Sequence, residues 1–372
     1  MDGSDKKRLR IAQMVTSQRS IPVPKGVIWA PIDLSLDIAE QLTARGHELT
    51  FYAPPSPKIP YRVVSGRLKE GLADPKFIKK ISQERKTMPY GLNHVALFDQ
   101  YLLIKMMQDA DRGRYDVLHI HLERALPLVG LFHTPTIITL HDPINPYGRR
   151  AYRLFNGPNT HLVSISRSQR KPAPNLNYAA NIYNGIDIKK FSFNPTPSNR
   201  FLFASRLVEQ KGVEEAIAVC RKTRSALDIY GRHYSKLYLQ AIKRLCSGKI
   251  KFHGGVDRSK MPKIYAQAKA LLFPIKWEEP FGLVMIEAMA CGTPVIAYRR
   301  GSVPEVVKHG KTGFIVNNRR EMIAAMKKID RIDRHECRRH VEKLFSIERM
   351  VNDYEKLYRR AVRQWGGRGR KE

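Results

Sequence analysis

The sequence predicts an α/β protein made of two domains. With 372 residues, the chain is too long for one ordinary domain and suits two domains of about 150 to 200 residues each. Apolar segments at 10–15 and 48–53 enclose a helical pattern at 32–45, and such a strand–helix–strand unit is typical of a parallel sheet. A further series of strands begins at 201–204, after a polar crossover that contains prolines.

The first domain is expected to span residues 1–190. In its first helix, Ile32, Leu36 and Leu42 fall on one helical face, and Gly46 follows as a candidate cap. Ser166 can cap another helix directly after a strand. The later elements expected in this domain are a helix at 95–108 and strands at 115–121, 136–140 and 161–165.

The second domain is expected to span residues 191–346. A last helix is predicted at 347–365, and residues 366–372 form a basic tail. The elements expected inside the domain are strands at 201–204, 226–230, 250–253 and 270–275 and helices at 260–268 and 283–291.

The central stretch of the chain, residues 277–294, holds two glutamates in an apolar setting. Glu287 lies in a helix that is apolar all round, and such a helix is normally buried. A buried carboxylate needs a hydrogen-bond donor, and a pair of ligand hydroxyl groups would serve. Glu279 lies in the loop before the same helix, whose N-terminus favours an anion such as a phosphate. Together these features indicate a sugar nucleotide.

Other candidate residues follow the carboxyl ends of predicted strands, where α/β sheets bind their ligands. Arg206 and Lys211 follow the strand at 201–204, and a bidentate guanidinium with a mobile ammonium suits a diphosphate. His121 ends the strand at 115–121. The adjacent pair His141 and Asp142 follows the strand at 136–140.

The string E-P-F-G-L-V-M-I-E-A-M-A-C-G-T-P-V-I-A, from Glu279, resembles the E-x7-E motif of retaining GT-B glycosyltransferases of the family 4 type. The segments G-S-V-P-E-V-V, H-G-K-T-G-F-I-V and N-G-I-D extend the resemblance. So does R-L-V-E-Q-K-G, which Ser205 precedes where the family usually has glycine.

The resemblance implies a GT-B fold: two Rossmann-like domains that face a cleft, with the C-terminal helix crossing back to the first domain. It implies that Arg206 and Lys211 hold the donor diphosphate. Glu279 would orient the sugar, Glu287 would bind the ribose, and His121 would hold the sugar or the acceptor in line. His141 and Asp142 would lie on the acceptor or sugar side of the site. Further donor-binding residues carried over from the family are Gly26, Phe281, Gly282, Leu283, Gly254 and Val256.

The implied activity is transfer of a hexosyl group, with retention, from a nucleoside diphosphate sugar to a glycan, a lipid or a small molecule. No cofactor and no metal is expected. An epimerase that eliminates and re-adds a nucleotide on an amino sugar shares this architecture and is an alternative. A non-catalytic basic protein that binds a membrane or a nucleic acid is another.

The chain is strongly basic, with a net charge of +32 and a pI near 10.1. Because the charge is spread over both domains and no nucleic-acid module is recognisable, a generally basic proteome explains it first. Contact of the basic segment 58–86 with an anionic membrane comes second, and specific nucleic-acid binding last.

The four cysteines are far apart, which favours a reducing compartment. No signal sequence or apolar span is recognisable. We therefore expect a cytoplasmic protein, with peripheral contact at the inner face of the membrane as a second interpretation.

Overall fold

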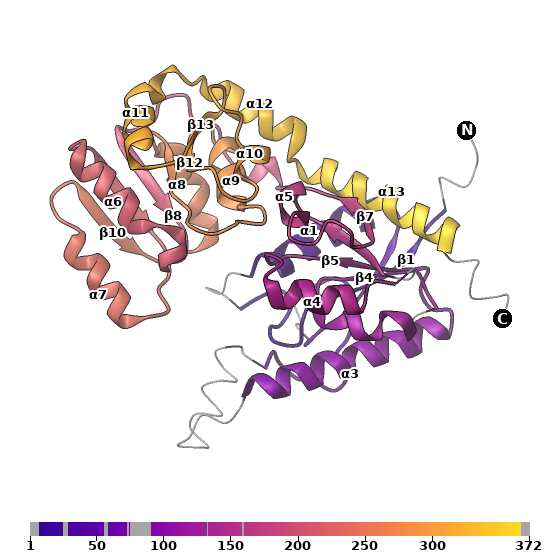
Figure 1. The fold of residues 1–372 in the computed structure, drawn as a ribbon. Helices are drawn as coiled ribbons and strands as arrows, with labels where there is room; N and C mark the ends of the chain where they lie inside the picture. Colours follow the sequence, from indigo (N-terminus) through magenta and orange to yellow (C-terminus); the bar gives the residue numbers. More distant parts are fainter. Residues whose placement is uncertain are drawn as a thin grey trace. The chain divides into compact units, whose positions relative to one another are not determined.

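A computed structural model of the chain describes residues 7–24, 29–55, 59–72, 74, 91–131, 133–157 and 160–365. The chain divides into two compact units, each of which is described by itself (Figure 1). Unit 1 comprises Met1–Ile165, Pro172–Ile182 and Met350–Glu372, and unit 2 comprises Ser166–Lys171 and Tyr183–Arg349.

The described strands of unit 1 form one parallel sheet. In sequence order they are β1 (Arg10–Met14), β2 (Glu48–Tyr52), β3 (Arg62–Val64), β4 (Val117–Ile120), β5 (Thr136–Thr139), β6 (His161–Ser164) and β7 (Tyr178–Asn181). The order across the sheet is β3-β2-β1-β4-β5-β6-β7, and every pairing is parallel. The first strand is therefore central, as in Rossmann-like folds.

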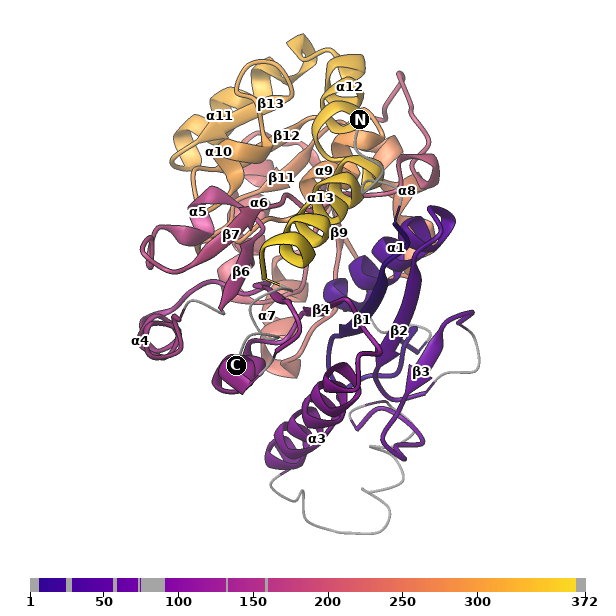
Figure 2. The same ribbon diagram turned by 90° about the vertical axis from the view of Figure 1, so that its right-hand side faces the viewer.

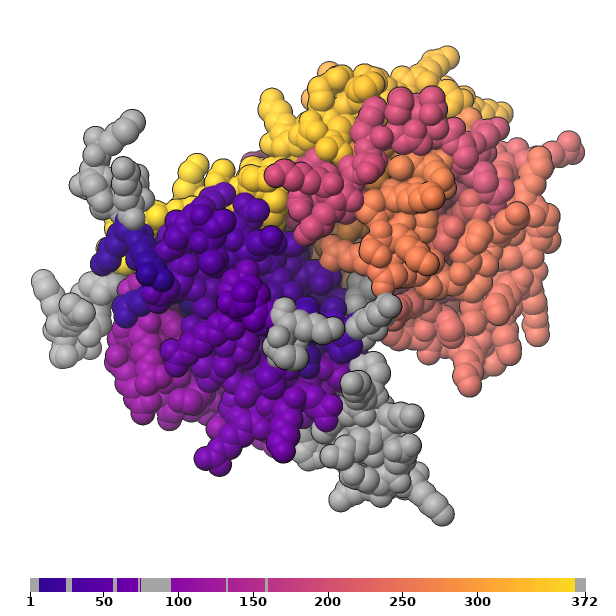
Figure 3. Space-filling model, turned by 180° about the vertical axis from the view of Figure 1, so that it is seen from behind, coloured from indigo at the N-terminus to yellow at the C-terminus, as the bar shows by residue number. Residues whose placement is uncertain are grey.

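Helices cover the sheet of unit 1 on both faces. They are α1 (Ala30–Ala44), α3 (Gly91–Asp111), the 3-10 helix η2 (Glu123–Leu131), α4 (Pro146–Leu154) and the greater part of α13 (Ile347–Trp365). In Figures 1 and 2, α3 and α13 lie on opposite sides of the strands. The surface of the amino-terminal residues of this unit is indigo to violet in Figure 3.

The two faces of this sheet differ in chemistry because successive side chains of a strand point to opposite sides. On one face, Met14, Leu118 and Ile120 belong to an apolar core that includes residues of α3. On the other face, His119 and Thr139 are buried polar side chains.

Unit 2 contains a second parallel sheet. Its described strands are β8 (Arg200–Ala204), β9 (Ala226–Tyr230), β10 (Ile250–Gly254), β11 (Leu271–Phe273), β12 (Val295–Tyr298) and β13 (Gly313–Val316). The order β10-β9-β8-β11-β12-β13 again places the first strand of the unit inside the sheet. From β8 the chain continues to β9 and β10 on one side of the sheet. From β11 it continues to β12 and β13 on the other side, so the direction of connection reverses between the neighbouring strands β8 and β11.

The principal helices of unit 2 are α6 (Val213–Lys222), α7 (Lys236–Leu245), α8 (Met261–Gln267), α9 (Leu283–Ala290), α11 (Arg319–Lys328) and α12 (Arg334–Leu344). Short helical segments lie at α5 (Arg167–Arg170), η3 (Ile188–Lys190), η4 (Glu209–Lys211), η5 (Arg258–Lys260), α10 (Val303–Val306) and η6 (Ile329–Arg331). As expected from its composition, α9 is buried from its third residue, Met285, to its end.

The expected boundary after residue 190 differs from the division in the structure, which falls after Ile182. The physical reason is a pairing of main chains: Ile186 donates its N–H to Phe345 and accepts from Ile347. Ser166 caps α5 as expected, by accepting the Gln169 N–H at 3.1 Å. That short helix belongs to unit 2 rather than to the first domain.

The predicted α/β class with two Rossmann-like parallel sheets is confirmed, and so is the return of the last helix to the first domain. Tyr358 of α13 donates to, or accepts from, Nδ1 of His119 on β4 at 2.6 Å. Gly26, the tail 366–372 and, in the basic segment 58–86, residues 58, 73 and 75–86 lie outside the described residues. Within the described part of the chain, every helix is too short or too polar to cross a membrane.

Candidate active site

Lys211 and Glu279 lie beyond the carboxyl ends of β8 and β11, where the strand order of unit 2 reverses. Open α/β sheets bind ligands at such a switch point. Lys211 ends the 3-10 turn η4 after β8, and Glu279 lies in the loop between β11 and α9. The sheet topology thus brings together two residues that are 68 positions apart in the sequence.

Lys211 and Glu279 form an ion pair that is almost closed to solvent. The Lys211 ammonium donates to Oε2 of Glu279, and the two residues are 7% and 9% exposed. Burial lowers the pKa of Lys211, the Glu279 carboxylate opposes that effect, and the positive charge of Arg206 adds to it. Because water screens them little, both groups should act strongly on a charged ligand.

Trp277 contacts both members of the pair. Its indole Nε1–H donates to the same Glu279 oxygen at 3.0 Å. The Lys211 ammonium lies 4.7 Å from the centroid of the Trp277 ring, within the range of a cation–π interaction. Trp277 was not predicted as a site residue, although it stands only two positions before Glu279.

The N-terminus of α9 adjoins Glu279. Gly282, directly before the helix, has φ = 79°, and a Cβ at this position would lie 3.3 Å from Cγ of Glu279. No side chain caps the helix, so its first N–H groups, beginning with Leu283, suit an anionic ligand. Phe281 has another place: its ring is buried against Tyr183 and Phe345, at centroid distances of 6.2 Å and 5.8 Å.

Glu287 has protein partners for its buried carboxylate. The hydroxyl of Tyr265 donates to Oε2 at 2.8 Å, and the Arg258 guanidinium lies 3.6 Å from Oε1. Burial and the adjacent carboxylate raise the pKa of Tyr265, which therefore keeps its proton. The hydrogen-bond requirement that led us to expect ligand hydroxyl groups is thus met within the protein, at least in part. Tyr265 and Arg258 were not expected from the sequence.

The remaining donor-side residues of unit 2 lie at neighbouring strand ends. Arg206 is exposed beyond β8 and is near enough to affect Lys211 electrostatically. Gly254 ends β10, and its carbonyl accepts the Gly231 N–H at 2.9 Å. Val256 follows in the same loop and is half-buried. These residues thus lie at the carboxyl edge of the sheet.

His121 of unit 1 contacts His141, which follows the adjacent strand β5. Nδ1 of His121 lies 2.9 Å from Nε2 of His141, and the rings stack with centroids 5.2 Å apart. Nε2 of His121 is buried and has no hydrogen-bond partner among the described residues. Burial lowers the pKa of both rings, that of His141 to about 4, so both are neutral at pH 7. Asp142 beside them is exposed.

His119, two residues before His121 on β4, has a structural place. Its Nε2 bonds to the Thr139 hydroxyl at 2.8 Å, and its Nδ1 bonds to the Tyr358 hydroxyl. The hydroxyl of Tyr354 bonds to the same threonine hydroxyl at 3.0 Å, so these side chains form one buried, hydrogen-bonded layer. Burial lowers the pKa of His119 to about 3. This neutral layer supports the ring of His121, whose centroid is 4.0 Å from that of His119.

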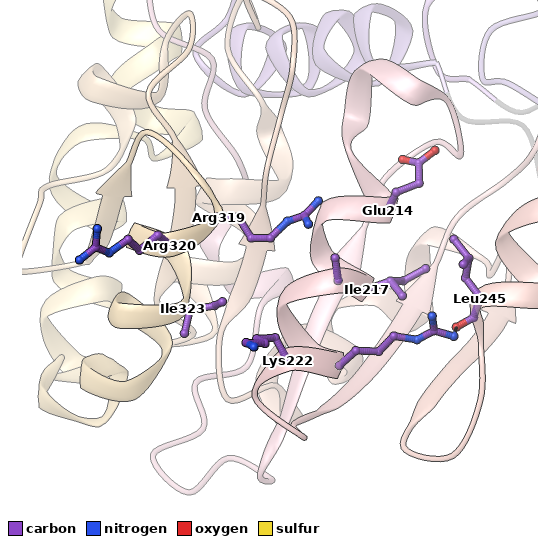
Figure 4. A pocket seen from close by; sticks show the side chains of 9 residues that line it. Glu214, Ile217, Lys222, Leu245, Arg319, Arg320 and Ile323 are labelled. Carbon is purple, nitrogen blue, oxygen red and sulfur yellow. Dashed lines mark hydrogen bonds between the residues drawn. The ribbon is translucent and has the colours of Figure 1, made fainter.

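A cavity of about 1020 Å³ lies elsewhere in unit 2, among α6, α7 and α11 (Figure 4). Its described lining includes Ile217 and Lys222 of α6, Leu245 of α7 and Ile323 of α11. None of the predicted site residues is among the described residues that line it. Within the described ranges, no group of three or more His, Cys, Asp or Glu side chains is placed to hold a metal ion.

Comparisons with known proteins cover both halves of the chain. The family model for Glycosyltransferase Family 4 matches residues 35–190, and that for Glycosyl transferases group 1 matches residues 186–343. The N-acetyl-alpha-D-glucosaminyl L-malate synthase of Bacillus anthracis is 23% identical over 368 residues, which cover 87% of this chain and 91% of that protein.

Two solved structures share the fold. Sucrose-phosphate synthase from Thermosynechococcus elongatus superposes with a TM-score of 0.73 at 19% identity, covering 95% of this chain and 99% of that one. Anabaena HepE, solved in complex with UDP and glucose, has a TM-score of 0.68 at 20% identity, covering 94% and 99%. The solved structures show that the chain has the GT-B fold. The two family models, which together cover residues 35–343, identify it as a glycosyltransferase of the family 4 type.

Proposed function

We propose that this glycosyltransferase moves a hexosyl group from a nucleoside diphosphate sugar to a glycan, lipid or small-molecule acceptor, with retention of anomeric configuration and without a metal. The observation that carries the proposal is the buried pair of Lys211 and Glu279 beside the uncapped N-terminus of α9. A cation and a helix N-terminus suit a diphosphate, and a carboxylate suits sugar hydroxyl groups. The UDP and glucose bound by Anabaena HepE support the same class of donor.

Each group has a separate task in the proposed reaction. Lys211, Arg206 and the first N–H groups of α9 stabilise the departing diphosphate, whose negative charge grows as its bond to the sugar breaks. Glu279 accepts hydrogen bonds from the sugar, and His121 holds the sugar or acceptor in line. One preorganised donor of this kind contributes about 2.7 to 4 kcal/mol, or about 100- to 1000-fold in rate.

Retention follows if the acceptor attacks on the face from which the diphosphate leaves. The bond between the acceptor oxygen and the anomeric carbon forms as the bond from that carbon to the phosphate oxygen breaks. The acceptor proton passes to an oxygen of the departing phosphate, so the protein need supply neither a base nor a covalent nucleophile. The products are the glycoside and the free nucleoside diphosphate.

On the nucleotide, Glu287 is proposed to bind the ribose, together with its protein partners Tyr265 and Arg258. The loop that contains Gly254 and Val256 is proposed to line the base. Gly26, outside the described residues, is proposed to approach the phosphates.

A thermal-shift panel of UDP-, GDP- and ADP-sugars tests the donor class. A ligand present at 100 times its dissociation constant adds about 2.7 kcal/mol of apparent stability. Glu279→Ala, Arg206→Ala and Lys211→Ala should each lower transfer at least about 100-fold while the fold is kept. Full activity in any one of them would remove that residue from the mechanism. Conversion of the donor sugar without an acceptor would indicate the epimerase instead.

The place of the reaction in the cell is a separate proposal. The four cysteines are free thiols, in keeping with a reducing compartment such as the cytoplasm. Peripheral contact with an anionic membrane rests on the net charge of +32. Co-sedimentation with anionic vesicles at low and high salt tests it, and absence of binding at low salt would dismiss it.

A further inference from the structure

Trp277 engages two charged side chains with two different parts of one ring system. The edge of the indole, through Nε1–H, holds the Glu279 carboxylate at 3.0 Å. The face of the ring lies against the Lys211 ammonium, 4.7 Å from the ring centroid. The centroid of the Phe273 ring lies 6.0 Å from the same ammonium. Trp277 therefore contacts both ends of the ion pair at once.

In the structure, the two charged groups neutralise each other. Lys211 donates to the Glu279 oxygen that also accepts from Trp277. Under the proposed function their tasks differ, because the lysine is needed at the diphosphate and the glutamate at the sugar. A donor molecule must therefore draw the ammonium at least partly away from the carboxylate.

A diphosphate is able to cause that exchange. It carries more negative charge than one carboxylate, so it competes for the ammonium in a site that water screens little. The positive charge of Arg206 disfavours the charged form of Lys211, and a diphosphate bound by both residues would offset that repulsion. Once the ammonium moves, Glu279 would lose its ionic partner and, without another donor, its fixed position.

We propose that Trp277 is a positioning residue of the transfer site: its indole N–H keeps the Glu279 carboxylate in place for the sugar when the donor diphosphate draws Lys211 away. The hydrogen bond from Trp277 does not depend on the lysine and persists through the exchange. The face of the ring stabilises the ammonium before the donor arrives. The inference rests on the proposed function, since it assumes a diphosphate at Lys211 and a sugar at Glu279.

The chemistry of the indole allows its two contacts to be separated. In Trp277→Phe an aromatic face remains for Lys211, but the donor to Glu279 is lost. In Trp277→Leu both are lost. Loss of a hydrogen bond to a charged group should lower the rate about 10-fold or more, and the loss falls on the transition state if Glu279 acts mainly there.

Steady-state kinetics test the positioning role. Trp277→Phe should lower kcat about 10-fold or more and change KM for the donor by less than about 3-fold. Trp277→Leu should lower kcat to a similar extent and lower KM for the donor, because the ring face that stabilises Lys211 before the donor arrives is lost as well. A ring that merely filled space would lower the melting temperature in both variants without this division between kcat and KM. Equal kcat in Trp277→Phe and the parent protein would overturn the proposal.

Fluorescence tests the exchange directly and needs no knowledge of the sugar or the acceptor. The chain has three tryptophans, so Trp29→Phe with Trp365→Phe leaves Trp277 as the single indole. Inorganic pyrophosphate and UDP, GDP and ADP are titrated while calorimetry follows binding. Binding of any of them should change the Trp277 emission in a saturable way, as the ammonium leaves the ring face, and Lys211→Met should abolish the change.

The outcomes separate the inference from the function on which it rests. Binding without a change in emission, or the same change in Lys211→Met, would overturn the exchange at Trp277 and leave the transferase proposal standing. Failure of pyrophosphate and all three nucleotides to bind would overturn the proposed function and the inference together. A Lys211-dependent change in emission with the expected kcat loss in Trp277→Phe would establish the positioning role.

Discussion

Nδ1 of His121 and Nε2 of His141 lie 2.9 Å apart, on two neutral rings that follow adjacent strands. One proton must lie between these two nitrogens, so the tautomer of His141 sets that of His121. If Nε2–H of His141 donates to Nδ1 of His121, then Nε2 of His121 carries its own hydrogen. That N–H can donate a hydrogen bond to a substrate oxygen. That atom is buried and has no partner among the described residues.

Substitution of His141 should therefore affect transfer through His121. A glutamine amide can take the place of the imidazole Nε2–H, whereas leucine of similar size cannot. His141→Leu should lower kcat about 10-fold or more, and His141→Gln should recover most of it. Nitrogen-15 spectra of the histidine rings report the tautomer of His121 in each variant. Equal activity in His141→Leu and the parent would show that His121 acts alone.

The ion pair of Lys211 and Glu279 should be coupled in stability. Lys211→Met leaves a buried carboxylate, and Glu279→Gln leaves a buried ammonium, each at a cost of about 3 to 5 kcal/mol. The double variant leaves neither charge, so its loss should be well below the sum of the single losses. Urea unfolding of the four proteins measures the cycle, and additive losses would mean that the two groups do not interact.

Activity should decline on the alkaline side below pH 10.5, the ordinary pKa of lysine. Burial lowers the pKa of Lys211, so its charge is lost as pH rises through that lowered value, and the diphosphate loses its ligand. The same shift acts oppositely on stability, because the unfolded lysine holds its proton up to 10.5 and folding gains as pH rises through this window. The profile of kcat/KM against pH measures this lowered pKa of Lys211. Lys211→Arg, weaker but charged throughout, should move the decline upward.

Gly301 controls the position of the Glu279 main chain. A Cβ at Gly301 would lie 2.2 Å from the carbonyl oxygen and 2.4 Å from the nitrogen of Glu279. Gly301→Ala should therefore shift Glu279 and lower kcat about 10-fold or more. Gly310 is the matched control, since its φ is also positive, at 76°, but nothing lies within 4 Å. Gly310→Ala carries the backbone strain alone, and equal kinetics in the two variants would refute the steric effect.

The sequence was sufficient for the fold because its patterns are local. Each element can be recognised within a single segment of the chain. Examples are the strand beginning at Arg10, the helix that ends before Gly46 and the apolar run of α9. The domain boundary was predicted after residue 190, whereas the division in the structure falls after Ile182. The difference arises because the pairing of Ile186 with Phe345 joins residues far apart in the sequence. No local pattern can show such a pairing.

The site was predicted by type and position rather than by contact. Arg206, Lys211 and Glu279 follow strand ends, and the sheet topology brings Lys211 to Glu279, a contact that was not predicted. Trp277 was overlooked because an aromatic residue near a strand is more often part of a core. Tyr265 was overlooked because its bond to Glu287 depends on how α8 packs against α9, which the sequence alone does not determine.

The anomeric configuration of the first product tests the central claim most directly. The protein is incubated with α-linked UDP-, GDP- and ADP-sugars, with water or a simple alcohol as acceptor, and proton spectra are recorded before the released sugar equilibrates. We predict release of the nucleoside diphosphate from at least one donor, with an α-linked first product, and loss of this release in Glu279→Ala and Lys211→Ala. A β-linked first product, or no release from any donor, would contradict it.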